Sequence, residues 1–242
     1  MINSAQQKQI EDYLILNKLP LDILLEVRDH MISQVSDLQI RENLSFDEAF
    51  FKTKIAWEPE FKMTKYFMFY TGEVSVLEKN IVKAKFNSIL KRSILIAIVL
   101  FIVNLFAIYI SKTPEFYGIL FKIQNGLVFA VPLALWIFHY NKRKFFRIDN
   151  KYRGKSFYTM YQQNNMILIA CISSTAQIIM HNGTSAYNFF RTDLPVDHIT
   201  VILTILIPFL AHIMLIFGSI NLFEHNKALE KIQDYIKFSE AE

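Results

Sequence analysis

Four long apolar stretches occupy the last two-thirds of this chain. They run at about Arg92–Ile110, Phe116–Tyr140, Met160–Met180 and Ile199–Phe223. A helix needs about 20 mainly apolar residues to cross the hydrocarbon core of a bilayer. Each stretch reaches that length with only isolated polar residues, whereas a helix on the surface of a soluble protein carries a polar stripe. The pattern therefore predicts an integral membrane protein with four spanning helices, at 92–110, 116–140, 160–180 and 199–223.

Composition favours an all-α fold around these stretches. The 242 residues are 52% hydrophobic and include only 6 Gly and 6 Pro, and the mean hydropathy is +0.24. Scarce Gly and Pro favour long helices over strands and turns. We expect a small N-terminal cytoplasmic helical domain followed by a four-helix transmembrane bundle. The single cysteine, Cys171, excludes an intramolecular disulfide.

The basic residues predict the topology of the chain in the membrane. The loop 141–155, between the second and third apolar stretches, holds one acid, Asp149, and seven basic residues: Lys142, Arg143, Lys144, Arg147, Lys151, Arg153 and Lys155. Basic residues in short loops stay on the cytoplasmic side. We therefore expect both termini and this loop to be cytoplasmic, in a bacterial inner membrane. Beside two spans, such a loop is typical of contact with anionic lipid headgroups, and no nucleic-acid partner is predicted.

The polar parts of the chain divide into three segments. Residues 1–58 predict a module of three short helices, the third opened by a capping box at Ser45–Glu48 and ended by Pro59. Residues 59–91 predict a helical connector, first packed under the membrane and then basic. Residues 224–242 continue the last span as a charged cytoplasmic helix. A three-helix core is small, so the module should need support from the membrane, a partner or a second copy.

One stretch of the module resembles a known family. Leu19-Pro20, Glu26 and Asp29-His30 lie on the second helix, and Leu44-Ser45-Phe46-Asp47-Glu48-Ala49 opens the third. This order and spacing resemble the N-terminal helical domain of HAAS-type bacterial membrane proteins, several of which accompany PadR-type transcription regulators. The resemblance covers about residues 8–58. It implies a cytoplasmic signalling or interaction module on a membrane anchor, and it implies no catalytic residue.

Four residues of the second helix are the candidate partner-binding residues: Glu26, Arg28, His30 and Asp37. Glu26 and His30 lie four residues apart, a spacing that also suits two metal ligands. A metal site needs three or four ligands, and the module has no second His and no Cys. The favoured interpretation is a surface that binds a cytoplasmic protein or a second copy of the chain, and no metal site is predicted.

Polar residues inside the apolar stretches form a second candidate site: Asn104, Lys122, Asn125, Gln177 and His212. Such residues usually face the interior of a bundle. One interpretation is a polar crevice that binds a small ligand or relays protons through Lys122, Gln177 and His212. The favoured interpretation is hydrogen bonding between helices, with Lys122 reaching outward to the headgroups.

Sequence motifs of enzymes are missing from the chain. The glycines never cluster into a phosphate-binding loop, no HExxH or GxSxG is present, and no catalytic residue or cofactor is predicted. The leading hypothesis is a non-enzymatic regulatory or accessory protein of the inner membrane. The alternative is a small transporter or channel-like subunit that uses the polar residues within the bundle. A third and weaker hypothesis is an intramembrane enzyme that acts on lipid.

Overall fold

The computed structural model describes residues 2–65, 73–139, 141–142, 145, 158–165, 167, 183–192, 195 and 197–241. Over these residues the chain is mostly helical, as composition predicts. It divides into two compact units. The first unit is Met1–Lys85 with Lys144–Gln162 and Glu224–Glu242, and the second is Phe86–Arg143 with Gln163–Phe223. Two long helices contribute residues to both.

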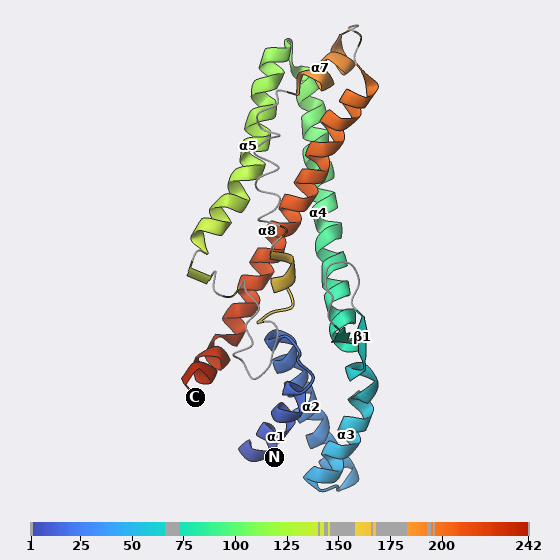
Figure 1. The fold of residues 1–242 in the computed structure, drawn as a ribbon, viewed down its shortest axis with the longest axis vertical. Helices are drawn as coiled ribbons and strands as arrows, with labels where there is room; N and C mark the ends of the chain where they lie inside the picture. Colours follow the sequence, from blue (N-terminus) through green and yellow to red (C-terminus); the bar gives the residue numbers. More distant parts are fainter. Residues whose placement is uncertain are drawn as a thin grey trace. The chain divides into compact units, whose positions relative to one another are not determined.

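Most of the described residues belong to α-helices (Figure 1). The helices are α1 (Ser4–Ile15), α2 (Leu21–Glu42), α3 (Phe46–Phe61), α4 (Val76–Ile110), α5 (Pro114–Phe138), α7 (Thr184–Arg191) and α8 (His198–Ala241). A short 3-10 helix, η2, covers Gln162–Asn164, and two strands, β1 (Met63–Lys65) and β2 (Glu73–Ser75), pair in antiparallel register.

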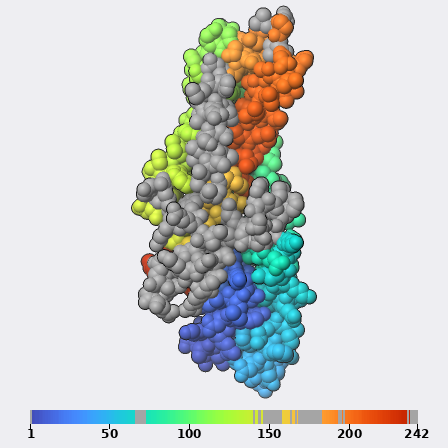
Figure 2. All heavy atoms as spheres, viewed as in Figure 1, coloured from blue at the N-terminus to red at the C-terminus, as the bar shows by residue number. Residues whose placement is uncertain are grey.

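Helices α1, α2 and α3 form the N-terminal module, drawn blue to cyan in Figure 2. The capping box that opens α3 is present: the Ser45 side chain accepts from the Glu48 N–H at 3.3 Å, and the Ser45 N–H donates to the Glu48 carboxylate at 2.9 Å. Apolar side chains of all three helices are buried together, and Tyr13 of α1 makes edge-on ring contacts with Phe50 and Phe61 of α3. The apolar side chains of the three helices therefore form a small core.

Pro59 does not end α3, although the sequence predicts a break there. The helix includes Pro59 and ends at Phe61. A proline inside a helix removes one hydrogen bond, to the carbonyl four residues earlier, which here is that of Ile55. Only two residues follow Pro59, and Phe61 is held by stacking on Trp57 at 5.8 Å between ring centroids. The ring contacts retain the last turn despite the missing bond.

The connector differs from the predicted helix at its beginning. Met63–Lys65 and Glu73–Ser75 form a short antiparallel β-hairpin, with Thr64 opposite Val74. Residues 66–72, which hold most of the connector's aromatic residues, lie outside the described part. From Val76 onward the connector is helical and continues without a break into the first apolar stretch, as one helix of 35 residues.

Three helices are long and apolar enough to cross a membrane: α4, α5 and α8. They contain the first and fourth predicted spans and the second up to Phe138, where α5 ends, and α8 continues past Phe223 as the predicted charged helix. Exposed large apolar side chains are frequent along them, for example Phe106 at 65% and Leu127 at 64% exposure. Such a surface suits hydrocarbon better than water. The third predicted span, 160–180, lies mostly outside the described residues, and its predicted first residue, Met160, lies in a turn instead.

The second unit combines the apolar parts of α4, α5 and α8 with the short helix α7. Helices α4 and α5 run antiparallel, and α7 lies at the end where α4 stops and α5 begins (Figure 1). Ala186 and Tyr187 of α7 are buried against Tyr117 and Phe121 of α5. Gly183 precedes α7 with φ 65°, and a Cβ there would lie 3.0 Å from the Tyr117 ring. A glycine therefore suits this close contact in both conformation and size.

Replacing Leu24 by Ala should destabilise the N-terminal module, because Leu24 is fully buried between the helices. We expect the free energy of unfolding to fall by about 2–5 kcal/mol. Leu16→Ala is the matched control: Leu16 is 78% exposed, so its effect should stay within about 0.5 kcal/mol. Urea unfolding of the full chain in micelles, followed by Trp57 fluorescence in a Trp136→Phe background, measures both. Equal effects of the two substitutions would contradict this core.

Candidate functional site

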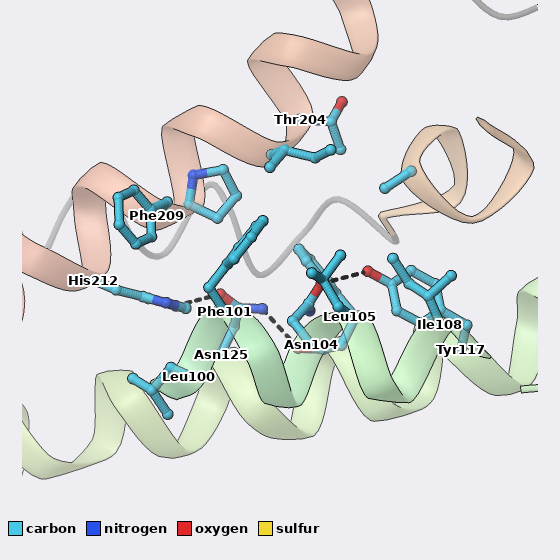
Figure 3. Close-up of a pocket in the computed structure, with 14 residues that line it drawn as sticks. Leu100, Phe101, Asn104, Leu105, Ile108, Tyr117, Asn125, Thr204, Phe209 and His212 are labelled. Carbon is cyan, nitrogen blue, oxygen red and sulfur yellow. Dashed lines mark hydrogen bonds between the residues drawn. The ribbon is translucent and has the colours of Figure 1, made fainter. Parts of the chain in front are cut away.

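A small cavity lies inside the second unit, where α4, α5 and α8 face one another (Figure 3). Its volume is about 20 Å³, and its lining includes the polar side chains of Asn104, Tyr117, Asn125, Thr204 and His212. A cavity of this size has room for about one water molecule. Three of these polar residues, Asn104, Asn125 and His212, are among the predicted intramembrane polar residues, so the structure brings part of that set together.

His212 and Asn125 form the hydrogen bond that links α8 to α5. The His212 Nε2 lies 2.9 Å from the Asn125 Oδ1, and both residues are buried. The Asn125 amide nitrogen donates at 2.8 Å to the Phe121 carbonyl of its own helix, which leaves its oxygen facing His212. Because an amide oxygen only accepts, the Nε2 carries the proton in this arrangement. The pair satisfies two polar groups at once within an apolar bundle.

A second chain of hydrogen bonds links α4 to α5. The Tyr117 hydroxyl donates to the Asn104 Oδ1 at 3.1 Å, and the Asn104 amide donates to the Gln124 Oε1 at 3.3 Å. The Gln124 amide then donates to the Leu100 carbonyl at 2.7 Å. Each amide along this chain both accepts and donates. Such bonds hold membrane helices together because hydrocarbon offers no other partner.

Pro208, inside α8, lies beside the cavity. A proline within a helix lacks the N–H that would bond the carbonyl four residues earlier, here that of Thr204. Both Pro208 and Thr204 line the cavity. The Thr204 hydroxyl bonds the Thr200 carbonyl at 2.7 Å, one turn further back. His212 follows Pro208 by one turn and also lines the cavity, where it bonds Asn125.

The other predicted intramembrane residues do not line this cavity. Lys122 has an exposed side chain on α5, whereas Asn125, three residues later, is buried. On a membrane helix an exposed side chain faces lipid, where a lysine stem reaches toward the headgroups. Gln177 lies outside the described residues. The crevice through Lys122, Gln177 and His212 is therefore not assembled by the residues that the structure describes.

The predicted partner-binding residues of α2 fall into two groups. Glu26, His30 and Asp37 are exposed. Arg28 is partly buried instead and lies 3.6 Å from the Glu11 carboxylate of α1 and 3.1 Å from that of Asp29. The guanidinium is thus engaged within the module. In the described part of the chain, no group of three or more His, Cys, Asp or Glu is arranged to hold a metal ion.

Of the seven basic residues of the loop 141–155, only Lys142 lies in the described part, directly after α5, where its side chain is partly buried. The predicted contact with lipid headgroups for Arg143, Lys144, Arg147, Lys151, Arg153 and Lys155 falls outside the described residues. The structure therefore adds no geometry to that prediction.

Sequence reasoning left two residues of this network out of the candidate site, Tyr117 and Gln124. Tyr117 was not selected as a candidate, because an aromatic residue near the end of an apolar stretch is typical of the aromatic belt at the membrane interface. A helical register check offers a signal, since Tyr117 shares a face with Phe121 and Asn125 at four-residue spacing. That Tyr117 bonds Asn104 on another helix depends on tertiary packing, and the local sequence around either residue does not predict this pairing.

Comparison with protein-family models, with curated proteins and with solved structures finds no match to this chain.

The His212–Asn125 hydrogen bond should contribute measurably to the stability of the bundle. Asn125→Leu, His212→Phe and the double variant form a double-mutant cycle, and we expect a coupling free energy of about 0.6 kcal/mol, with an upper range near 1.7 kcal/mol. The unfolding equilibrium of the full chain in bicelles measures it. Lys122→Leu combined with His212→Phe is the control cycle and should show no coupling. Equal coupling in both cycles would contradict the assigned pair.

Proposed function

We propose that this chain is a non-enzymatic regulatory or accessory protein of the bacterial inner membrane. The bundle anchors it, and the exposed face of α2 binds a cytoplasmic protein or a second copy. The observation that carries this proposal is the contrast between the two candidate sites. Among the described residues, the polar side chains that line the cavity bond one another or the helix backbone, whereas Glu26, His30 and Asp37 on the module are exposed.

The bundle supports an anchoring role through its hydrogen bonds. The Tyr117–Asn104–Gln124 chain and the His212–Asn125 pair connect α4, α5 and α8. A ligand site needs polar groups that are left to bind the ligand, and a transport path needs continuous hydration. The cavity of about 20 Å³ provides space for about one water. These features favour a helix-packing role for Asn104, Asn125 and His212.

The module supports a binding role through its exposed α2 face. Along α2, the buried residues lie on one side, and Glu26, Asp29, His30 and Asp37 are exposed. Charged residues on a rim change the association rate and the choice of partner more than they change affinity. The resemblance of residues 8–58 to the HAAS module agrees with this role. We therefore propose the HAAS-type family, a four-span topology and cytoplasmic termini together with it.

Charge reversal on this face should remove partner capture. Glu26→Lys with Asp37→Lys changes two exposed acids while leaving the module core intact, so a bound partner should be lost through repulsion. In-cell crosslinking of the tagged full chain, followed by mass spectrometry, measures the captured protein. We expect a cytoplasmic protein or a second copy to be captured by the unmodified chain and reduced at least about tenfold in the variant.

The matched control reverses two acids outside α2. Asp12→Lys with Asp47→Lys makes the same change in net charge, and both residues are exposed on α1 and α3. This variant should capture the partner as well as the unmodified chain. Loss of capture in both double variants, or in neither, would refute the α2 face as the binding surface.

The transporter hypothesis predicts flux that the packing of the described bundle does not favour. Purified protein in liposomes should pass K⁺ and H⁺ at the rate of protein-free liposomes, because a cavity of about one water gives no hydrated path. A pH-sensitive dye inside the vesicles and a K⁺ gradient measure the flux. Protein-dependent flux that His212→Phe abolishes would establish the transporter instead.

A further inference from the structure

The first unit holds a contact between segments that are distant in the sequence. Leu21 at the start of α2, Tyr158 and the α8 residues Leu229 and Ile232 form one buried apolar cluster. At the edge of the same unit the Tyr235 hydroxyl donates to the Glu11 carboxylate at 2.8 Å. The N-terminal module is thus docked on residues 158–160 and on the last turns of α8.

Asp22 is the polar centre of this contact. Both of its carboxylate oxygens lie 3.1 Å from the Met160 N–H, and one also accepts from the Ile23 N–H at 3.0 Å. The Asp22 N–H donates to the Tyr158 carbonyl at 3.3 Å. One residue therefore bonds the 158–160 segment as acceptor and as donor. Next to it, the Thr159 hydroxyl lies 2.6 Å from the His225 Nδ1 of α8.

Among the residues that the structure describes, the titratable groups around Asp22 are mainly acidic. Glu26 lies one turn further along α2, and its charge acts on the Asp22 carboxyl. Glu78 of α4 is only 5% exposed, and the charge of Asp22 acts on its carboxyl in turn. The 158–162 segment contributes Tyr161, whose hydroxyl also feels the charge of Glu224, and α8 contributes Glu224 and His225. Among the described residues no lysine or arginine forms an ion pair with Asp22.

Burial is the main cause that raises the pKa of Asp22 from 3.8 to about 7, and the charge of Glu26 adds to it, against the lowering effect of the Met160 and Ile23 N–H groups. A carboxyl with a higher pKa in the docked than in the released state takes up a proton on docking. Docking is therefore strongest below pH 3.8. It weakens by up to about tenfold per pH unit until about pH 7, and is constant above that.

We propose that the contact of Asp22 with residues 158–160 is a proton-controlled latch, closed when the carboxyl is protonated and loosened when it is ionised. The latch holds the N-terminal module on the C-terminal end of α8. Release uncovers Leu21, Tyr158, Leu229 and Ile232 together. The partner-binding function proposed for α2 is separate from the latch, because the latch uses the buried start of α2 and needs no second molecule.

Distance measurements by double electron–electron resonance on the full chain in lipid nanodiscs test the latch. Spin labels at Ile40→Cys and Lys231→Cys, in a Cys171→Ser background, use two exposed positions. About 30 Å of helix separates Ile40 from the docked start of α2, within the measurable range. We expect one narrow distance at about pH 5. At about pH 8, a broader and longer population should appear.

Two carboxyl variants test whether Asp22 causes the change of the distance with pH. Asp22→Asn is neutral at every pH and keeps an acceptor for the Met160 N–H, so its distance should stay narrow at both pH values. Asp12→Asn is the matched control, an exposed aspartate on α1 of the same module, and should respond to pH as the parent does. A parent whose distance does not change with pH overturns the latch. So does an Asp22→Asn variant that keeps the response, or one that is released at both pH values.

Hydrogen exchange of the Met160 amide in the unsubstituted chain gives an independent readout that needs no label or variant. After correction for the intrinsic pH dependence of exchange, its protection should fall at least about tenfold between about pH 5 and about pH 8. The Trp57 indole N–H, which donates to Gln34 at 2.8 Å between α3 and α2, should show little change, because the module itself stays folded. Equal protection of the Met160 amide at both pH values would overturn the latch.

Discussion

The exclusion of water from a hydrocarbon core governs the second unit. Every backbone N–H and C=O there needs a partner within the chain, and continuous helices such as α4, α5 and α8 satisfy this need. The same constraint acts on the polar side chains. Ser93, Ser111 and Ser219 turn back to bond the carbonyl four residues earlier, at 2.8, 2.6 and 2.7 Å. The hydroxyl groups of these short side chains thus bond the backbone of their own helix.

Longer polar side chains carry more than one polar group, so a bond to their own helix, such as that of Asn125 to the Phe121 carbonyl, satisfies only part of them, and the remaining bonds link helices. Asn104 and Gln124 are bonded across α4 and α5, and His212 finds Asn125 across α8 and α5. Lys122 is exposed on α5 instead, in keeping with the high cost of burying an ammonium group without a counter-charge. The position of each residue thus follows from the kind of polar group it carries.

Features that depend on local physics could be predicted from the sequence, and features that depend on long-range contacts could not. Hydropathy over about 20 residues predicts the apolar parts of α4, α5 and α8, and the Ser45–Glu48 spacing predicts the start of α3. The paired strands Met63–Lys65 and Glu73–Ser75 were not predicted. Their sequence also fits an amphipathic helix, and the pairing of strands is not a local property of the sequence. Asp22 was overlooked as a site residue since Met160, its bonding partner, lies 138 residues away.

The support that a three-helix module needs comes partly from its own chain. The core of α1, α2 and α3 is small, and a small domain buries a low fraction of its surface. Tyr158, Leu229 and Ile232 enlarge that core by covering Leu21. Fully burying one such side chain stabilises by about 1.5–3 kcal/mol, so this contact is a substantial share of the stability of a domain this size. Any change that loosens the start of α2 therefore acts on the module and on the end of α8 together, and a single carboxyl there influences the whole first unit.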